Sequence, residues 1–289
     1  MTNLSMGHVQ HLRQETGARI VDCKEALLAV NGNLEEAKEW LRKKGMASGA
    51  KKTQRVAGEG VIAVRAENGF GVLLEINCET DFVARSSDFQ EFAYAVVDLA
   101  MEHKVSTLDE LCELKTQRIP VKEKVLELAG KVGENVLLRR MATEWIDPGV
   151  VVPYTHSPLS VSLGKMGVLV ALRSEGKADD LFEVGKKIAM HIAAANPHCI
   201  SIDQVDEGVV LKERAFLLEQ IQGDGRPPEI LEKMVQGRLR KFFEMSVLEE
   251  QDFVCAPEKK VKTFLKEEEE RLGKSIRVAH FVRFMLGSE

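Results

Sequence analysis

The chain has 289 residues, of which 44% are hydrophobic and 29% charged, so it can bury a substantial core, and its length suggests about two domains. Its 40 Lys and Arg residues stand against 45 Asp and Glu residues, and the net charge of −5 argues against a generally basic surface for nucleic acids. No apolar stretch approaches the roughly 18 residues that a membrane-spanning helix needs, and the first residues lack the basic start and apolar core of a secretory signal.

The cysteines indicate a reducing compartment. They are odd in number, widely spaced and never arranged as a CxxC pair, so neither a disulfide framework nor a zinc ribbon is indicated. They are Cys23, Cys78, Cys112, Cys199 and Cys255. Together with the missing export signal, this pattern predicts a cytoplasmic protein.

The N-terminal segment predicts three short helices separated by glycine. Asp22 stands three residues before Glu25, a spacing at which each side chain can cap a backbone amide at a helix start. Asn33 and Glu36 repeat that spacing. Lys44-Gly45 predicts the end of the third helix. A three-helix unit of this size is marginal alone, so we expect a small docking head.

The segment from Met46 to Gly60 predicts a linker, because it mixes Gly, Ala, Ser and Lys without an apolar period. It continues a basic cluster that consists of Arg42, Lys43, Lys44, Lys51, Lys52 and Arg55. Charge runs of this kind are usually solvated, so a flexible tether is favoured over a contact with RNA or an acidic partner. Head and linker are placed in residues 1–55.

Residues 56–145 are predicted to form a first core subdomain. Two β-type runs, Val61–Val64 and Gly71–Ile76, flank Glu67-Asn68-Gly69, which predicts a β-hairpin. After Asp88 the apolar residues recur at i, i+3, i+4 and i+7, which predicts an amphipathic helix.

A weak repeat indicates a second, similar subdomain in residues 146–289. Gly167-Val168-Leu169-Val170 resembles Gly71-Val72-Leu73-Leu74, and a predicted helix follows each run. Two related α+β units would explain this echo. A final strand is predicted at about residues 276–286.

Residues 203–246 predict a helical hairpin inserted in that second subdomain. Gly223-Asp224-Gly225-Arg226-Pro227-Pro228 is a strong turn signal, because Gly permits positive φ and Pro favours a helix start. Such a hairpin usually packs on itself. Partner binding and a homodimer through the hairpin stay open as alternatives.

The chemistry of an enzyme is not indicated. The chain has no GxxxxGK[ST] phosphate loop, no HExxH and no GxSxG. His8 and His11 share one helical face, but we identify no third ligand beside them and expect no metal site. Cys78, at a predicted strand end, is expected to be a small packed hydrophobe rather than a nucleophile.

One segment has an unusual composition. Asn77-Cys78-Glu79-Thr80-Asp81-Phe82-Val83-Ala84-Arg85 directly follows the strand through Ile76, and loops carried by a rigid sheet often hold functional residues. From the residues alone, a structural role is favoured, with Asp81 as a helix cap and Phe82 and Val83 as the first buried residues.

Ordered motifs along nearly the whole chain resemble the elongation factor Ts family, the exchange factors for elongation factor Tu. The matching segments are Leu12–Ala18, Asp22–Leu27, Asn31–Asn33, Glu75–Ala84, Gly133–Asn135, Tyr154–His156, Ile188–Ala194, Glu232–Arg238 and Phe281–Phe284.

That resemblance implies an α+β fold. It consists of an N-terminal three-helix head like a ubiquitin-associated domain, two related α+β core subdomains with antiparallel sheets, and an inserted helical hairpin. It also implies a translation elongation factor that is not an enzyme and uses no cofactor. The implied partner is elongation factor Tu, GDP-bound or nucleotide-free, with no membrane and no direct nucleic-acid contact.

The resemblance also assigns site residues. In the family a Thr-Asp-Phe-Val loop pushes into the GTPase domain of elongation factor Tu, disturbs its Mg²⁺ site and promotes GDP loss, so that GTP can load. By motif match these residues are Thr80, Asp81, Phe82 and Val83. Phe82 would be the wedge and Asp81 the electrostatic perturbation, with Thr80 and Val83 holding the loop.

Two further contacts follow from the resemblance. The head would dock through apolar residues, here Ile20 and Val21, although Arg19 departs from the small residue expected before them. His156 matches a Tyr-x-His that touches another domain of the partner. The competing hypothesis is an RNA-associated or protein-binding adaptor without exchange activity.

Overall fold

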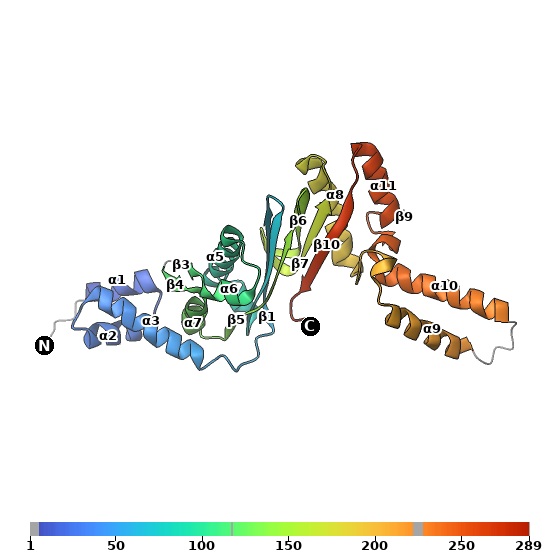
Figure 1. The fold of residues 1–289 in the computed structure, drawn as a ribbon. Coiled ribbons are helices and arrows are strands. Elements are labelled where there is room, and N and C mark those ends of the chain that lie inside the picture. The colour runs from blue at the N-terminus through green and yellow to red at the C-terminus, as the bar shows by residue number, and fades with distance from the viewer. Residues whose placement is uncertain (1–5, 117, 222–227, 289) are drawn as a thin grey trace.

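A computed structural model describes residues 6–116, 118–221 and 228–288. The fold is α+β, as predicted, with helices at both ends of an elongated molecule and the sheet between them (Figure 1). Within the described ranges, no helix combines the length and the apolarity needed to cross a bilayer.

Three helices form the head: α1 (Met6–Thr16), α2 (Ile20–Ala29) and α3 (Leu34–Ala50). Their contact faces enclose a small apolar cluster that includes Leu12 and Leu27. Asn33 caps α3 as predicted, because its Oδ1 accepts the backbone N–H groups of Glu35 and Glu36 at 3.1 and 3.3 Å.

The cap predicted at Asp22 is wrong. Helix α2 already begins at Ile20, and its N-cap residue, Arg19, makes no side-chain capping hydrogen bond. Asp22 therefore lies inside the first turn, where its carboxylate accepts a hydrogen bond from Lys44 Nζ at 2.7 Å. Glu25, three residues later, also accepts a hydrogen bond from Lys44, so the two acidic residues join α2 to α3.

The helix end predicted at Lys44-Gly45 is also wrong, because α3 continues to Ala50. It crosses α7 (Val121–Val132) at glycines: a Cβ on Gly130 would collide with the Gly45 carbonyl oxygen, and one on Gly49 with that of Leu126. Glycine has a low helix propensity, but the packing of α3 against α7 stabilises the helix across these positions. A flexible tether is therefore excluded for the residues up to Ala50.

The first half of the core contains a three-stranded antiparallel sheet with β2 in the middle. Asn68 and Gly69 join β1 to β2 with φ of 50° and 74°, and two positive φ angles are what a two-residue hairpin turn requires. The hairpin prediction is thus confirmed. The elements of this half are β1 (Glu59–Glu67), β2 (Phe70–Cys78), α4 (Asp81–Ala84), α5 (Ser87–His103), α6 (Leu108–Glu113), β3 (Lys115–Thr116), β4 (Ile119–Pro120), α7 and β5 (Val136–Trp145).

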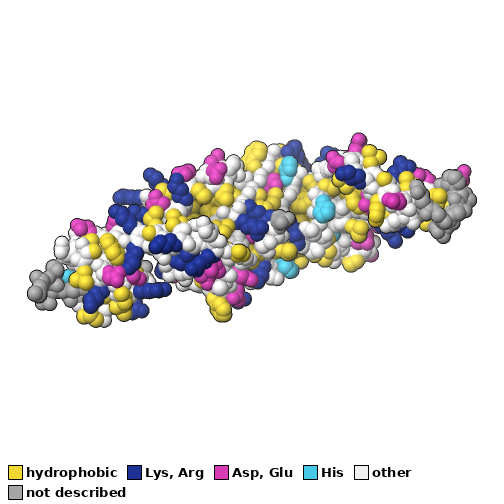
Figure 2. Space-filling model, turned by 90° about the horizontal axis from the view of Figure 1, so that it is seen from below, with side chains coloured by type: hydrophobic (Ala, Val, Ile, Leu, Met, Phe, Trp, Pro, Cys, Tyr) yellow, Lys and Arg dark blue, Asp and Glu magenta, His cyan; other side chains and the backbone are white. Residues whose placement is uncertain are grey.

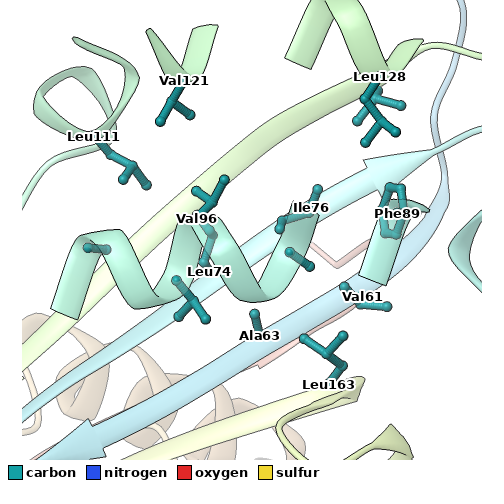
Figure 3. Close-up of a cluster of buried hydrophobic side chains, with 14 of the residues drawn as sticks. Val61, Ala63, Leu74, Ile76, Phe89, Val96, Leu111, Val121, Leu128 and Leu163 are labelled. Carbon is teal, nitrogen blue, oxygen red and sulfur yellow. The ribbon is translucent and has the colours of Figure 1, made fainter. Parts of the chain in front are cut away.

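Helix α5 covers one face of this sheet. Its residues Phe89 and Val96 lie over Leu74 and Ile76 of β2 and over Val61 of β1 in the cluster of Figure 3. All five side chains are at most 1% exposed. At roughly 25 cal/mol per Å² of apolar surface, such a layer fixes the helix on the sheet.

The second half repeats this order, with β7 in the middle of an antiparallel sheet. The helical hairpin is inserted between α8 and the last strand; its predicted turn, Gly223–Pro227, lies outside the described residues. The elements are β6 (Gly149–Ser160), β7 (Leu163–Arg173), α8 (Ala178–Ala195), η1 (Ile202–Gln204), α9 (Glu207–Ile221), α10 (Pro228–Ser246), η2 (Leu248–Glu250), β8 (Asp252–Phe253), β9 (Ala256–Lys260), α11 (Val261–Leu272) and β10 (Arg277–Met285).

The two three-stranded units join through β1 and β7 and enclose a third apolar cluster. The repeated glycines face it: a Cβ on Gly71 would lie 3.0 Å from Leu169 Cδ2, and one on Gly167 would lie 2.6 Å from Leu73 Cδ1. Each glycine therefore makes room for a leucine of the other half. The glycine that recurs in the two repeated sequence segments thus marks, in each half, the position where a strand closely approaches the other half.

A buried carboxylate ties the end of the chain to the first half. Glu75 of β2 is fully buried, and its oxygens accept hydrogen bonds from Arg139 Nη1 at 3.1 Å, Arg140 Nε at 2.7 Å and the Gly287 backbone N–H at 3.0 Å. The Arg140 guanidinium also lies 4.3 Å from the ring centroid of Phe284 on β10. This cluster fixes β10 against β2 and β5.

Candidate functional site

A one-turn helix, α4, directly follows the central strand of the first half. Thr80 is its N-cap, with extended backbone, and the Thr80 hydroxyl oxygen accepts the Val83 N–H at 3.4 Å. The cap predicted at Asp81 is therefore wrong by one residue. Asp81 lies in the first turn, where its Oδ2 is 3.6 Å from Arg85 Nε.

The Thr80–Val83 turn presents an aromatic ring to solvent. Phe82 is 82% exposed, whereas Ala84 is 4% exposed and Val83 packs against the core of the first half. Burial of Phe82, favoured from the residues alone, is thus wrong, whereas Val83 is partly buried as expected. An exposed Phe on an anchored turn leaves apolar surface in water, which is typical of a contact site.

Two residues after α7 hold this turn from behind. Glu134 Oε2 accepts the backbone N–H groups of Glu79 and Thr80 at 3.1 and 3.0 Å, and Glu134 Oε1 accepts the Thr80 hydroxyl at 2.6 Å. In return, Glu79 Oε1 accepts the Asn135 N–H at 2.6 Å. Asn135 is 1% exposed, and its Nδ2 donates to the Arg55 carbonyl at 2.7 Å. Three segments of the chain thus converge behind Phe82.

Cys78 completes the buried side of the turn. Its thiol is fully buried and lies 3.1 Å from the Thr80 carbonyl oxygen. Burial, with a further contribution from the nearby Glu134 carboxylate, raises the pKa of Cys78 to about 12. The thiol is therefore protonated at neutral pH, and the prediction of a packed side chain rather than a nucleophile is confirmed.

A small groove separates α4 from the β6–β7 hairpin of the second half. It has a volume of about 230 Å³ and is lined by Asp81 and Arg85 on one side and by Ser157 and Lys165 on the other. His156 is exposed on β6 beside this groove, with Nδ1 3.2 Å from the Tyr154 hydroxyl. The two halves of the core thus meet next to Phe82.

Ile20 and Val21, the predicted contacts of the head, lie beside a larger cleft. Ile20 and Val21 are 49% and 65% exposed at the start of α2. A cavity of about 790 Å³ between head and core is lined by Arg19 and Lys52 and by Gly133, the residue before Glu134. On the face shown in Figure 2, Lys and Arg side chains gather where the N-terminal helices meet the core.

Most of the basic cluster is engaged with other side chains. Arg42 Nη1 lies 2.9 Å from Glu123 Oε2, Lys44 Nζ lies 2.6 Å from Glu25 Oε2, and Arg55 Nη1 lies 3.4 Å from Glu79 Oε1. Burial lowers the pKa of Lys52, and the neighbouring Arg55 and Arg19 lower it further. Arg42, Lys52 and Arg55 thus contact the core, whereas Lys44 pairs within the head.

Sequence reasoning missed the role of Glu134 and Asn135. The Gly-Glu-Asn motif was visible, but nothing in a single sequence connects residue 134 with residue 80. It also overlooked Glu15, whose Oε2 lies 3.5 Å from His11 Nδ1. Among the described residues, no three His, Cys, Asp or Glu side chains gather as metal ligands.

These features define an α+β protein with a helical head and a core of two related halves, in which the first half presents an exposed aromatic ring on a turn fixed by hydrogen bonds. Comparison with known proteins agrees with this class. The family model described as elongation factor TS matches residues 79–288.

Full-length relatives are similar along almost all of the chain. Elongation factor Ts of Rhodospirillum centenum is 44% identical over 99% of this chain and 94% of the relative. Those of Paramagnetospirillum magneticum and Rhodospirillum rubrum are 41% and 42% identical over 99% of this chain and 92% and 94% of the relatives. The chain belongs to the elongation factor Ts family, and it is a translation elongation factor.

Proposed function

We propose that this chain binds elongation factor Tu in its GDP-bound form and promotes GDP release through the Thr80–Val83 turn, so that GTP can load. The observation that supports this most directly is Phe82, 82% exposed on a capped turn whose next two residues are anchored in the core. Family membership supports the choice of partner. The protein would act in the cytoplasm as an exchange factor and catalyse no covalent step.

The physical mechanism is a shift between two conformations of the partner. Tight nucleotide binding depends on Mg²⁺ and on a phosphate-binding loop, so a ring and a carboxylate inserted near them favour the nucleotide-free conformation. Phe82 would be the wedge, and Asp81 would perturb the charge around the metal. Moving a 1:99 equilibrium to 99:1 requires roughly 5.5 kcal/mol of differential affinity. Because coupling is reciprocal, incoming GTP would expel the factor.

Two surfaces would add affinity on either side of this turn. The apolar side chains of Ile20 and Val21, exposed on the head, would contact the GTPase domain across the cleft that Gly133 lines. His156, exposed on β6, would contact a second domain of the partner. Neither surface would perturb the nucleotide itself, so their loss is expected to weaken binding more than the maximal exchange rate.

The test is a stopped-flow measurement of fluorescent GDP release from elongation factor Tu. Phe82→Ala is expected to lower the maximal release rate roughly thirtyfold, the size of a typical aromatic hot spot. Phe182→Ala is the matched control, because Phe182 is also exposed, at 41%, but lies on α8 of the second half. Unchanged release by Phe82→Ala, or an equal loss in both variants, would contradict the proposal.

The adaptor hypothesis makes a different prediction. An RNA-binding adaptor would show salt-sensitive RNA binding and no effect on GDP release. The engagement of Arg42, Lys44 and Arg55 with carboxylates argues against it, since those cations are already partly neutralised. Acceleration of GDP release by substoichiometric protein would exclude an adaptor without exchange activity.

A homodimer through the helical hairpin stays a prediction. It is supported by Leu211 and Phe216 of α9, which are 63% and 54% exposed, whereas Leu217 and Val235 are buried between the two helices. Sedimentation of wild-type protein and of Leu211→Glu would test it. A dimer that the variant abolishes would support the prediction, and a monomeric wild type would exclude it.

A further inference from the structure

Glu134 accepts three hydrogen bonds at the start of the Thr80–Val83 turn, and the proposed exchange mechanism gives it no role. One carboxylate oxygen accepts two consecutive backbone N–H groups, of Glu79 and Thr80, and the other accepts the Thr80 hydroxyl. Two of the three donors belong to Thr80, the N-cap of α4, and the third belongs to the residue before it. Hydrogen bonds to a carboxylate are stronger than those between neutral groups, so this one side chain can define the conformation of the turn.

The direction of these hydrogen bonds matters. The Thr80 hydroxyl has a single proton, and the Glu134 carboxylate, which can only accept, must receive it. The hydroxyl lone pairs are then free to accept the Val83 N–H, which is the bond that caps α4. Glu134 thus sets the orientation of the hydroxyl, and the hydroxyl sets the start of the turn that carries Phe82.

The position of Glu134 is itself fixed from both sides. Gly133 ends α7 with φ of 85°, a left-handed conformation that favours glycine, and turns the chain toward the end of β2. On the other side, Asn135 is buried and bonded to Glu79 and to the Arg55 carbonyl. The carboxylate is therefore held in place before any partner binds.

We infer that Glu134 is a positioning residue for nucleotide exchange: through Thr80 it preorganises the turn on which Phe82 projects. This inference rests on the proposed function, since it assigns a second residue to the same step. A preorganised turn enters the partner without first being ordered, and that lowers the barrier to GDP release.

Three variants test the inference. Glu134→Ala removes all three hydrogen bonds. Glu134→Gln retains an amide oxygen for the two backbone N–H groups, but its NH₂ group cannot accept the proton of the Thr80 hydroxyl and can only donate to the hydroxyl oxygen. Glu110→Ala is the matched control, because Glu110 likewise accepts two consecutive backbone N–H groups, of Ser106 and Thr107, but at the start of α6.

The readout is the rate of GDP release against factor concentration. Glu134→Ala is expected to lower the maximal rate about tenfold or more, the order of effect that a misplaced group has, with a smaller change in the half-saturating concentration. Glu134→Gln is expected to restore part of that loss, because it keeps the acceptor for the two backbone N–H groups and loses the acceptor for the hydroxyl, and Glu110→Ala is expected to match the wild type. A wild-type maximal rate in Glu134→Ala, an equal loss in Glu110→Ala, or no rescue by Glu134→Gln would each overturn the inference.

Amide hydrogen exchange separates this inference from the proposed function. The Glu79 and Thr80 amides should lose protection in Glu134→Ala and keep it in Glu110→Ala, whatever the partner does. The wild-type protein could fail to accelerate GDP release from the partner while the two amides still lose protection in Glu134→Ala. The proposed function would then be wrong, and the preorganisation of the turn would stand. Unchanged protection in Glu134→Ala would overturn the preorganisation. Should Glu134→Ala not fold, Thr80→Val, which keeps the backbone contacts and loses the hydroxyl, is expected to show a partial loss of rate.

Discussion

The two halves of the core have the same scaffold but differ after the central strand. In the second half, β7 turns directly into α8, with the Gly176 N–H donating to the Ser174 hydroxyl at 3.1 Å. In the first half, α4 and the exposed Phe82 are interposed between β2 and α5. The second half instead carries its insertion, the helical hairpin, after α8.

This difference shows how a duplicated fold acquires separate surfaces. Both halves bury a helix on one sheet face and share the apolar layer on the other, so those faces are constrained equally. The strand ends and the helix ends are free to vary, because they lie outside both layers. The comparison predicts two kinds of effect. Substitutions of residues at the contact between the two halves should change the stability of the fold, whereas substitutions in the inserted segments should change binding to the partner.

The largest effect is expected from the carboxylate that joins the halves. Glu75→Ala should lower the free energy of unfolding by about 3 kcal/mol, because two arginines and the Gly287 N–H lose their buried acceptor. The low end of the usual range applies, since the side chains of Arg139 and Arg140 are 34% and 26% exposed. Urea unfolding at pH 7 measures it, with Glu102→Ala, exposed on α5, as the control. A loss no larger than that of the control would show that the halves hold together without this cluster.

The same carboxylate predicts acid sensitivity. Burial alone would raise the pKa of Glu75, but the Gly287 N–H and Arg140 outweigh it and hold the pKa below its usual range. The stabilisation is therefore complete above the unfolded pKa of about 4.3 and is lost as the pH falls through the folded pKa. Glu75→Gln should flatten this decline, and a parallel decline in both proteins would exclude Glu75 as its source.

The next largest effect is expected from the paired glycines. Gly71→Ala and Gly167→Ala should each cost about 1–3 kcal/mol, because the new Cβ meets buried side chains of the other half of the core. Gly237→Ala is the control, since no atom lies within 4 Å of a Cβ there in α10, and it should be neutral or stabilising. Very different costs at Gly71 and Gly167 would mean that the two halves do not pack symmetrically.

Local sequence signals predicted the elements that depend on neighbouring residues. The β1–β2 hairpin follows from Asn68-Gly69, and the start of α3 follows from Asn33. The end of α3 was missed because Gly45 and Gly49 stop a solvated helix but allow close contact with α7. Strand β6 was missed because it contains prolines, which are tolerated there since β6 pairs on one side only, with β7.

The candidate site was predictable in its residues but not in its geometry. The motif match located Thr80 to Val83, whereas hydrophobicity alone favoured a buried Phe82 and so failed. The contact between Glu134 and Thr80 spans 54 residues of sequence. Propensity and periodicity describe only local preferences, so a long-range hydrogen bond of this kind leaves no signal in one chain.

A smaller effect of pH on stability is expected from the second half, at a higher pH than the effect of Glu75. His191 of α8 is fully buried, with Nε2 2.9 Å from Gln251 Oε1 and Nδ1 accepting the Val254 N–H at 3.2 Å. Because Nδ1 accepts, the ring is neutral in this arrangement, and burial lowers its pKa despite the hydrogen bond to Gln251.

Stability should therefore be unaffected by His191 above its unfolded pKa of about 6.5 and should fall as the pH drops from there toward the folded pKa. Each unit by which the pKa is lowered corresponds to about 1.4 kcal/mol. Urea midpoints between pH 8 and pH 5.5 measure this, and His191→Gln should flatten them. An NMR titration that gives His191 an ordinary pKa would remove the basis of this prediction.

The smallest effect on stability is expected where the effect on function is largest. Phe82→Ala should change the free energy of unfolding by less than about 0.5 kcal/mol, because the ring is 82% exposed and makes little use of the core. Phe182→Ala, in the other half, should be similarly mild at 41% exposure. Thermal unfolding of both variants beside their GDP-release rates sharpens the comparison of the halves. Two mild stability changes with one selective loss of exchange would locate the function in the first half, whereas a clear destabilisation by Phe82→Ala would mean that the ring belongs to the scaffold.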